Sequence, residues 1–151
     1  MAGGEASCHS EQLKVFVYYI GKPKDAHANR IAEEFVRRAS HYTGMQMVEI
    51  RPERADLAAK HPTARRIYLD PGGREMDSPA FSELFAEAEM AGQDVVFLIG
   101  GADGLPAAWR KQASFLLSLS RMTFPHELAR AMLAEQIYRA FAILRGHPYP
   151  R

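Results

Sequence analysis

The stretch that decides the fold is residues 94–145, which reads DVVFLIGGADGLPAAWRKQASFLLSLSRMTFPHELARAMLAEQIYRAFAILR. It opens with a short, continuous apolar run at residues 95–99, which is typical of a strand buried on both faces. The run ends in GGADG at residues 100–104. Because glycine has no side chain, this part of the backbone can turn sharply and approach a ligand closely. The segment therefore predicts a buried strand followed by a loop that can reach a ligand.

A second apolar run at residues 115–119 is followed by SRMTFP at residues 120–125, and we expect a long helix from about residue 126 to 145. The two strands are expected to lie side by side, each ending in a loop. Ligands of open α/β sheets bind outside the carboxyl ends of the strands, so the pattern predicts a pocket between these two loops. The alternative is that both loops only turn the chain.

Working outward, the N-terminal half supplies three further strands, which we expect at residues 13–20, 45–50 and 67–70. The third strand should end in the turn Pro71-Gly72-Gly73. Residues 52–60 predict a short helix or a loop.

Two helices separate these strands. The first should begin after a cap at Asp25 and run to about residue 42, with Ile31, Phe35 and Ala39 on its buried face. The second should begin at Ser78-Pro79 with Ser78 as its cap, and end at Gly92. Its apolar stripe is formed by Phe81, Leu84, Phe85 and Ala88. Strands that alternate with helices predict an α/β fold with a mainly parallel sheet and helices on both faces.

The chain has 151 residues, which suits a single domain over residues 13–151, preceded by a polar leader at residues 1–12 that we expect to be disordered. Neither a membrane segment nor a secretion signal is evident, and the one cysteine, Cys8, can form neither an intrachain disulfide nor a metal site. These features predict a cytoplasmic protein without metal.

The charge is distributed unevenly, although the net charge is only +1. Residues 105–151 hold seven basic and two acidic side chains, a net charge of +5, whereas the remainder holds 12 basic and 16 acidic ones, a net charge of −4. The C-terminal third can therefore present a positive face to phosphates. The alternative is a solvated helix face with ion pairs such as Glu127–Arg130 and Glu135–Arg139.

Three motifs in this order, GGADGL, LSLSRMTFPHELAR and AEQIYRAFAILRGHPY, resemble the ribosomal RNA large-subunit methyltransferase H family. The resemblance covers residues 13–151 and is densest after Asp94. It implies a SPOUT-class enzyme that methylates N3 of a pseudouridine in large-subunit (23S) ribosomal RNA, with S-adenosylmethionine as methyl donor. It also implies a C-terminal trefoil knot, whereas physical rules alone predict an unknotted, doubly wound sheet.

The resemblance assigns the cofactor to three loops that follow strand ends. The implied cofactor-binding residues are Leu69, Gly100, Gly101, Leu119, Ser120, Arg121, Met122, Thr123 and Phe124. The alternative for Met122 and Phe124 is core packing. Asp103 stands where many family members have Glu, and we expect this shorter carboxylate to have little effect on cofactor binding.

The acceptor is an imide N–H, so a base or a cation that stabilises the imidate should help the transfer. The resemblance suggests four residues of the last helix and tail for the catalytic site: Glu135, Arg139, Tyr149 and Arg151. Arg139 and Arg151 can bind phosphate or developing charge, Tyr149 can stack on a base, and Glu135 can orient Arg139 instead of acting as a base. His126 is a further candidate, although capping or packing at the helix start is the simpler expectation.

Two departures from the family pattern bear on activity. Pro150 stands where the family has His, which places His147 as the nearest substitute, and the segment at residues 50–67 is short for the family. These departures keep open a ribosome-binding or assembly factor of the same fold with reduced or lost catalysis. A nucleotide-binding enzyme with an unknotted sheet is a third possibility.

The family forms homodimers through the C-terminal helices, and the last helix here carries apolar residues on more than one side: Leu128, Met132, Leu133, Ile137, Tyr138, Phe141 and Leu144. The expected partners are therefore a second copy of the chain and large-subunit rRNA, either free or in the assembled ribosome, and no membrane.

Overall fold

The computed structural model describes residues 13–149 and contains one five-stranded sheet with the order β2-β1-β4-β3-β5. All four pairs of neighbouring strands are parallel. The strands are β1 (Lys14–Ile20), β2 (Gly44–Ile50), β3 (Arg65–Arg74), β4 (Val95–Ile99) and β5 (Phe115–Leu117). The predicted α/β class and parallel sheet are therefore confirmed.

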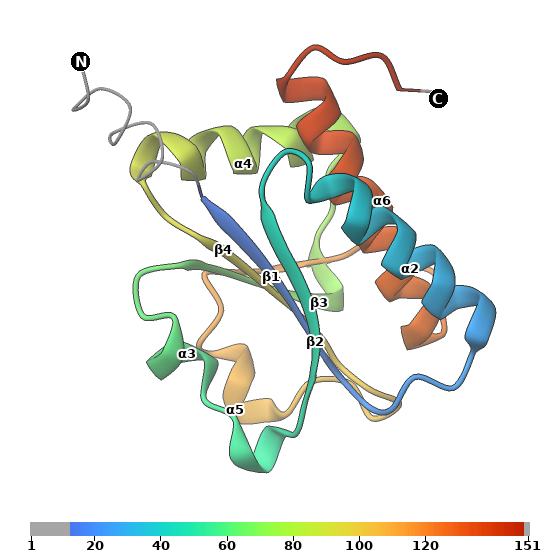
Figure 1. The fold of residues 1–151 in the computed structure, drawn as a ribbon. Coiled ribbons are helices and arrows are strands. Elements are labelled where there is room, and N and C mark those ends of the chain that lie inside the picture. Colours follow the sequence, from blue (N-terminus) through green and yellow to red (C-terminus); the bar gives the residue numbers. More distant parts are fainter. Residues whose placement is uncertain (1–12, 150–151) are drawn as a thin grey trace.

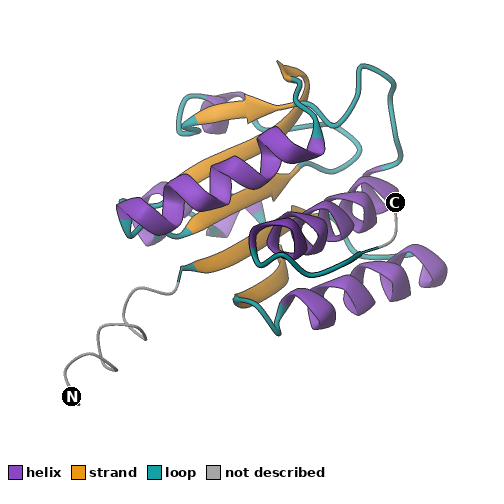
Figure 2. Cartoon of the chain, turned by 90° about the horizontal axis from the view of Figure 1, so that it is seen from above, coloured by secondary structure: helices purple, strands orange, loops and turns teal. Residues whose placement is uncertain are grey.

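Helices cover both faces of this sheet (Figure 1). The long helices α2 (Ala26–Ala39), α4 (Ser78–Ala91) and α6 (His126–Leu144) lie on one face. The 3-10 turn η1 (Pro52–Arg54) and the short helices α3 (Leu57–Lys60) and α5 (Ala107–Arg110) follow β2 and β4, and α3 and α5 pack on the opposite face (Figure 2 views the layers from above). None of the helices within residues 13–149 is long and apolar enough to cross a membrane.

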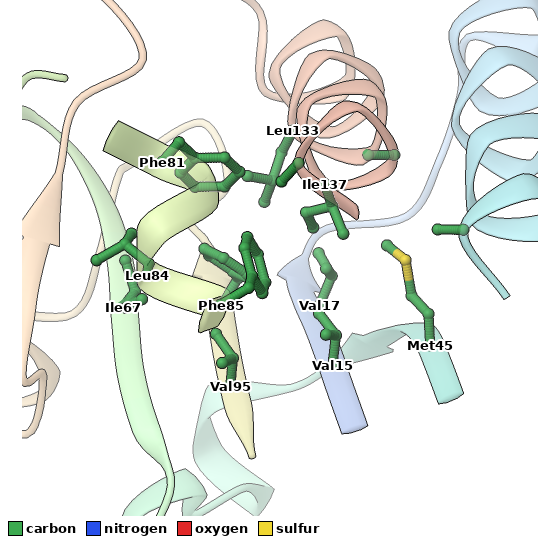
Figure 3. Close-up of a cluster of buried hydrophobic side chains, with 14 of the residues drawn as sticks. Val15, Val17, Met45, Ile67, Phe81, Leu84, Phe85, Val95, Leu133 and Ile137 are labelled. Atoms are coloured by element: carbon green, nitrogen blue, oxygen red, sulfur yellow. The ribbon is translucent and has the colours of Figure 1, made fainter. Parts of the chain in front are cut away.

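The position of β4 at the centre of the sheet explains why the run at residues 95–99 is apolar throughout. Its five residues are all buried, and they alternate between two cores. Val95, Phe97 and Ile99 belong to the larger core under α2, α4 and α6, whereas Val96 and Leu98 face α3 and α5. In the larger core, side chains of α4 and α6 meet those of the strands (Figure 3).

The predicted neighbourhood of the last two strands is wrong, because β3 lies between β4 and β5. The third strand is also longer than predicted. It continues through Pro71-Gly72-Gly73 to Arg74 as a bulge, and the register against β5 shifts between Leu69 and Arg74. A Cβ on Gly73 would lie 2.6 Å from the backbone of Leu116, so only glycine allows β5 to approach here.

Two details of the helices also differ from the prediction. Ile31 is 47% exposed, and α2 instead buries Ala28, Ala32 and Ala39. The cap of α4 is Asp77, whose carboxylate accepts from the backbone N–H of Ala80, so Ser78 is the first helical residue. The cap at Asp25, the apolar stripe of α4 and its end at Gly92 are confirmed. The expected leader lies outside the described residues, and the trefoil knot stays a prediction.

Candidate functional site

A cavity of about 570 Å3 lies at the bulge of β3 and at the carboxyl ends of β4 and β5. Although β4 and β5 are not neighbours, the loops that follow them both reach this cavity, together with residues 69–71 in the bulge of β3, and we call it the three-loop cavity. The lining residues are Leu69, Asp70, Pro71, Ile99, Gly100, Gly101, Ala102, Gly104, Leu105, Leu117, Leu119, Ser120, Met122, Thr123, Phe124, Pro125, His126 and Ala129. The predicted pocket at the carboxyl edge of the sheet is therefore present.

The glycine loop after β4 is folded tightly against itself. The N–H of Gly104 donates to the carbonyl of Gly101 at 2.9 Å, and Gly104 has a φ of 77°. A Cβ on Gly100 would lie 2.6 Å from the backbone of Gly104, and one on Gly101 would lie 3.1 Å from the carbonyl oxygen of Ile20. These glycines let the backbone itself form the cavity wall.

Two side-chain hydrogen bonds shape the loop after β5. The hydroxyl of Ser118 donates to the carbonyl of Ser120 at 2.9 Å, and the hydroxyl of Ser120 accepts from the N–H of Met122 at 3.0 Å. Met122 is 73% exposed, so the core-packing alternative is wrong for this residue, whereas Phe124 is half-buried. Eight of the nine predicted cofactor residues border the cavity; Arg121 is exposed and does not, and Asp103 also lies outside the lining.

A second group of predicted residues forms one polar cluster on the later half of α6. Glu135 Oε2 accepts from Arg139 Nη2 at 2.6 Å and from the hydroxyl of Tyr149 at 2.8 Å. The Arg139 guanidinium lies 4.6 Å from the centre of the Tyr149 ring. Burial, followed by the hydrogen bond to Glu135, raises the pKa of Tyr149 to about 12. The structure thus brings together three of the four predicted catalytic residues, while Arg151, like Pro150, lies outside the described residues.

The cluster does not border the cavity of the three loops. Glu135 instead lines an adjacent cavity of about 620 Å3, which shares Leu117 and Leu119 with the first. Most other side chains of this adjacent cavity are apolar. They come from α2, α4, α6 and the β3–α4 connection: Ile31, Phe35, Met76, Phe81, Leu128, Ala131 and Met132. In one chain, the segment after β5 therefore separates the three-loop cavity from the polar cluster.

The two candidate histidines occupy different places. His126 borders the three-loop cavity but does not cap α6, for which no side chain caps the N-terminus. The carboxylate of the next residue, Glu127, accepts from the backbone N–H groups of Asp25 and Lys24, which precede α2. These hydrogen bonds lower the pKa of the Glu127 carboxyl group. His147 Nδ1 lies 2.6 Å from the hydroxyl of Tyr42, and His147 does not line the three-loop cavity.

Ion pairs engage much of the basic C-terminal third. The predicted pair Glu135–Arg139 is confirmed, and Arg145 pairs with Glu89 at 2.6 Å. The predicted pair Glu127–Arg130 is wrong, because Arg130 is only 3% exposed, donates to Asn29 and lies over the Tyr19 ring. The basic face is thus less available to phosphates than the count of charges indicates.

Sequence reasoning missed a third, open cavity of about 680 Å3 between the ends of α2 and α6. It is lined by Arg38, His41, Tyr42, Tyr138, Arg145 and His147. The combination of basic and aromatic side chains suits nucleic acid. These residues come from α2, α6 and the segments that follow these two helices, which are far apart in the sequence, so no local motif predicts the cavity. Among the described residues, no group of His, Cys, Asp and Glu is arranged to hold a metal ion.

Comparisons with known proteins agree on one family. A family model described as a predicted SPOUT methyltransferase matches residues 13–150. The chain is 65% identical over 139 residues to a ribosomal RNA large subunit methyltransferase H from Solibacter usitatus, which covers 92% of this chain and 100% of that protein. A protein of the same name from Chromobacterium violaceum is 36% identical over 155 residues, which cover 92% and 99% of the two chains.

Solved structures agree with these sequence matches at the level of the fold. A probable methylase family protein from Haemophilus influenzae has a TM-score of 0.57 and 10% identity, over 93% of this chain and 73% of that one. At this identity, the likeness concerns the fold alone.

Proposed function

The chain belongs to the SPOUT methyltransferases of the ribosomal RNA large subunit methyltransferase H family, and we propose that it methylates N3 of a pseudouridine in large-subunit rRNA. The observation that carries the proposal is the cavity at the carboxyl edge of the sheet. It is formed by residues 69–71 of β3 and by the loops after β4 and β5, and these two loops carry the family motifs GGADGL and LSLSRMTFPHELAR. We further propose that residues 13–151 act as a single, knotted domain in the cytoplasm.

The three-loop cavity fits S-adenosylmethionine. Its volume of about 570 Å3 lies within the range of small-molecule sites. Leu69, Leu119 and Phe124 offer apolar surface for the adenine ring, while the backbone at Gly100 and Gly101 is free of side chains and can approach the ligand's polar edges. When bound, S-adenosylmethionine supplies a methyl group on a sulfonium, which the acceptor nitrogen attacks in line.

The polar cluster suits stabilisation of the acceptor better than proton removal. Glu135 Oε2 already accepts from Arg139 and Tyr149, so Glu135 positions Arg139 instead of acting as the base. The Arg139 guanidinium can then stabilise the negative charge that develops on the imide. The neutral Tyr149 ring offers a face on which a base can stack.

A homodimer would bring this cluster to a cofactor cavity, because the two lie apart in one chain. The adjacent apolar cavity favours such an assembly: Ile31 and Leu128 are 47% and 41% exposed beside the half-buried Phe35 and Met132. We propose that a second copy of the chain covers this face and completes the site. Leu128→Glu should then shift the protein to monomers in sedimentation experiments. Met90→Glu, which changes a 91% exposed methionine on α4, should leave the dimer intact.

The experiment that tests the activity uses purified protein, labelled S-adenosylmethionine and two substrates, free large-subunit rRNA and ribosomes, both from cells that lack the modification. Incorporation at N3 of one pseudouridine supports the proposal, and the better substrate identifies the natural partner. Incorporation elsewhere, or no cofactor binding, contradicts it.

The departure at Pro150 favours a second candidate, a ribosome-binding factor with reduced catalysis, because proline has neither a base nor a side-chain donor. Cofactor and ribosome binding without methyl incorporation would support this candidate. Restoration of incorporation by Pro150→His would then attribute the lost activity to the tail.

A further inference from the structure

Asp70 is the only acidic residue that lines the three-loop cavity, considering the part of the chain that the structure describes. It follows Leu69, where the regular pairing of β3 with β5 is interrupted and the bulge begins. The rest of the lining is apolar or neutral in character, apart from His126. A single carboxylate is therefore the main fixed negative charge at this wall.

Two contacts hold the Asp70 carboxylate in place. Oδ2 accepts from the backbone N–H of Gly72 at 2.9 Å, and Oδ1 accepts from Arg110 Nη2 at 2.5 Å. Each carboxylate oxygen has two lone pairs, so these contacts leave room for further acceptance. The orientation of the carboxylate is thus fixed without exhausting its capacity to bind.

The ion pair is electrically asymmetric with respect to the cavity. The side chain of Asp70 is 11% exposed, whereas that of Arg110 is 46% exposed and does not border the cavity. Water and salt screen an exposed charge more strongly than a buried one. The Asp70 carboxylate at this wall is therefore screened less by solvent than the Arg110 guanidinium with which it pairs.

We infer that Asp70 determines ligand specificity in this cavity, because its carboxylate favours binding of the cationic methyl donor over binding of the neutral product. This inference rests on the proposed methyl transfer. In the transfer, the sulfur–methyl bond breaks and its electron pair remains on sulfur, while a bond forms from the acceptor nitrogen to the methyl carbon. The acceptor nitrogen releases its proton to water, and the sulfonium becomes an uncharged thioether. An anionic wall binds the ligand before this step better than after it, so product is released and replaced more readily.

The competing explanation is that Asp70 and Arg110 only fasten the end of β3 to α5. The two explanations differ in their effect on ligands. A purely structural pair would alter the cavity for all ligands alike, whereas a charge contact acts on the cationic ligands alone. The ratio of two dissociation constants therefore separates them, and it does not depend on catalytic activity.

The test measures dissociation constants by calorimetry for three ligands: S-adenosylmethionine, S-adenosylhomocysteine and sinefungin, which carries an ammonium group near the sulfonium position. In Asp70→Asn, both cationic ligands should bind about fivefold to tenfold more weakly, while the neutral S-adenosylhomocysteine keeps its affinity. The matched control is Asp103→Asn. It removes an exposed carboxylate from the glycine loop outside the lining, and it should leave the affinities for all three ligands unchanged.

The possible outcomes separate this inference from the proposed function. The inference would be overturned if Asp70→Asn bound all three ligands more weakly by the same factor, or if it bound S-adenosylmethionine more weakly but sinefungin as well as the wild type does. Either result would leave the cofactor assignment intact. Failure of the wild-type protein to bind any of the three would instead overturn the proposed function. If Asp70→Asn does not fold, Asp70→Ser offers a second neutral acceptor for the Gly72 N–H and makes the same prediction.

Discussion

The three-loop cavity and the polar cluster on α6 are built on opposite principles. The cavity uses glycine backbone and mostly apolar side chains, and its glycine loop is closed by the 2.9 Å backbone hydrogen bond from Gly104 to Gly101. The cluster consists of charged and hydroxyl side chains, and three donor groups of Arg139 and Tyr149 share one oxygen of Glu135. This difference indicates that the cavity depends mainly on the space its backbone leaves open, whereas the cluster depends on the charges and hydrogen bonds of its side chains. Added volume should therefore damage the cavity, and changed charge should damage the cluster.

The largest effect is expected from adding volume at Gly100. In Gly100→Val, the new Cβ would begin 2.6 Å from the backbone of Gly104, so the glycine loop must move. We expect a loss of about 1–3 kcal/mol in the free energy of unfolding and undetectable S-adenosylmethionine binding in calorimetry. Gly92→Ala is the matched control: it strains a left-handed backbone at the end of α4, but its Cβ meets open space. It should lower stability by about 1 kcal/mol and preserve binding. Unchanged binding in Gly100→Val would contradict the dependence on shape.

The next effect concerns charge in the cluster. Arg139→Gln removes the guanidinium that contacts Glu135 and Tyr149 while leaving the three-loop cavity intact. We expect kcat for methyl transfer to fall about 100-fold, as for the loss of a group that stabilises developing charge, with an unchanged Kd for the cofactor. Arg37→Gln removes an exposed arginine that is ion-paired on α2 and should change neither quantity. A parallel loss of cofactor binding in Arg139→Gln would show that the two regions are not separable.

A smaller effect is expected from one hydroxyl. Tyr149→Phe keeps the aromatic face beside Arg139 but removes the 2.8 Å hydrogen bond to Glu135. Because Arg139 still holds Glu135, we expect kcat to fall only about tenfold, in line with the loss of one hydrogen bond to a charged group. Single-turnover kinetics would measure this step directly. A loss as large as that of Arg139→Gln would mean that the hydroxyl itself takes part in the transfer.

The two regions also differ in how far the sequence predicts them. The apolar run at Val95–Ile99 identifies the central strand, because a short, β-branched run of this kind is typical of a strand covered on both faces. Eight of the nine residues predicted to bind the cofactor line one cavity. The order of the strands is less accessible, because nothing in the local pattern shows that β3 separates β4 from β5. Likewise, the contact of Asp70 with Arg110 joins residues from different elements.

The sequence predicts least well which side chains are buried and which are exposed. Ile31 has the spacing of a buried residue, yet α2 packs on α6 through small alanines and leaves Ile31 at the surface. Glu127 and Arg130 have the spacing of an ion pair, but each finds a better partner in a different element. Periodicity identifies an apolar face, whereas the neighbouring helix decides which part of that face is covered.

The smallest effect is a pH dependence that arises in the cluster and not in the three-loop cavity. Tyr149 has a pKa of about 12 in the folded chain, against about 10 in an unfolded one. Its neutral form is therefore favoured by folding. The stabilisation is complete below about pH 10 and is lost as the pH rises from there towards about 12. The difference in the free energy of unfolding between wild type and Tyr149→Phe should be constant from about pH 7 to 9 and shrink above about pH 10. Other tyrosines ionise equally in both proteins and cancel in this difference. A difference that remained constant through the alkaline range would show that Tyr149 ionises alike in the folded and unfolded chains, contrary to its contact with Glu135.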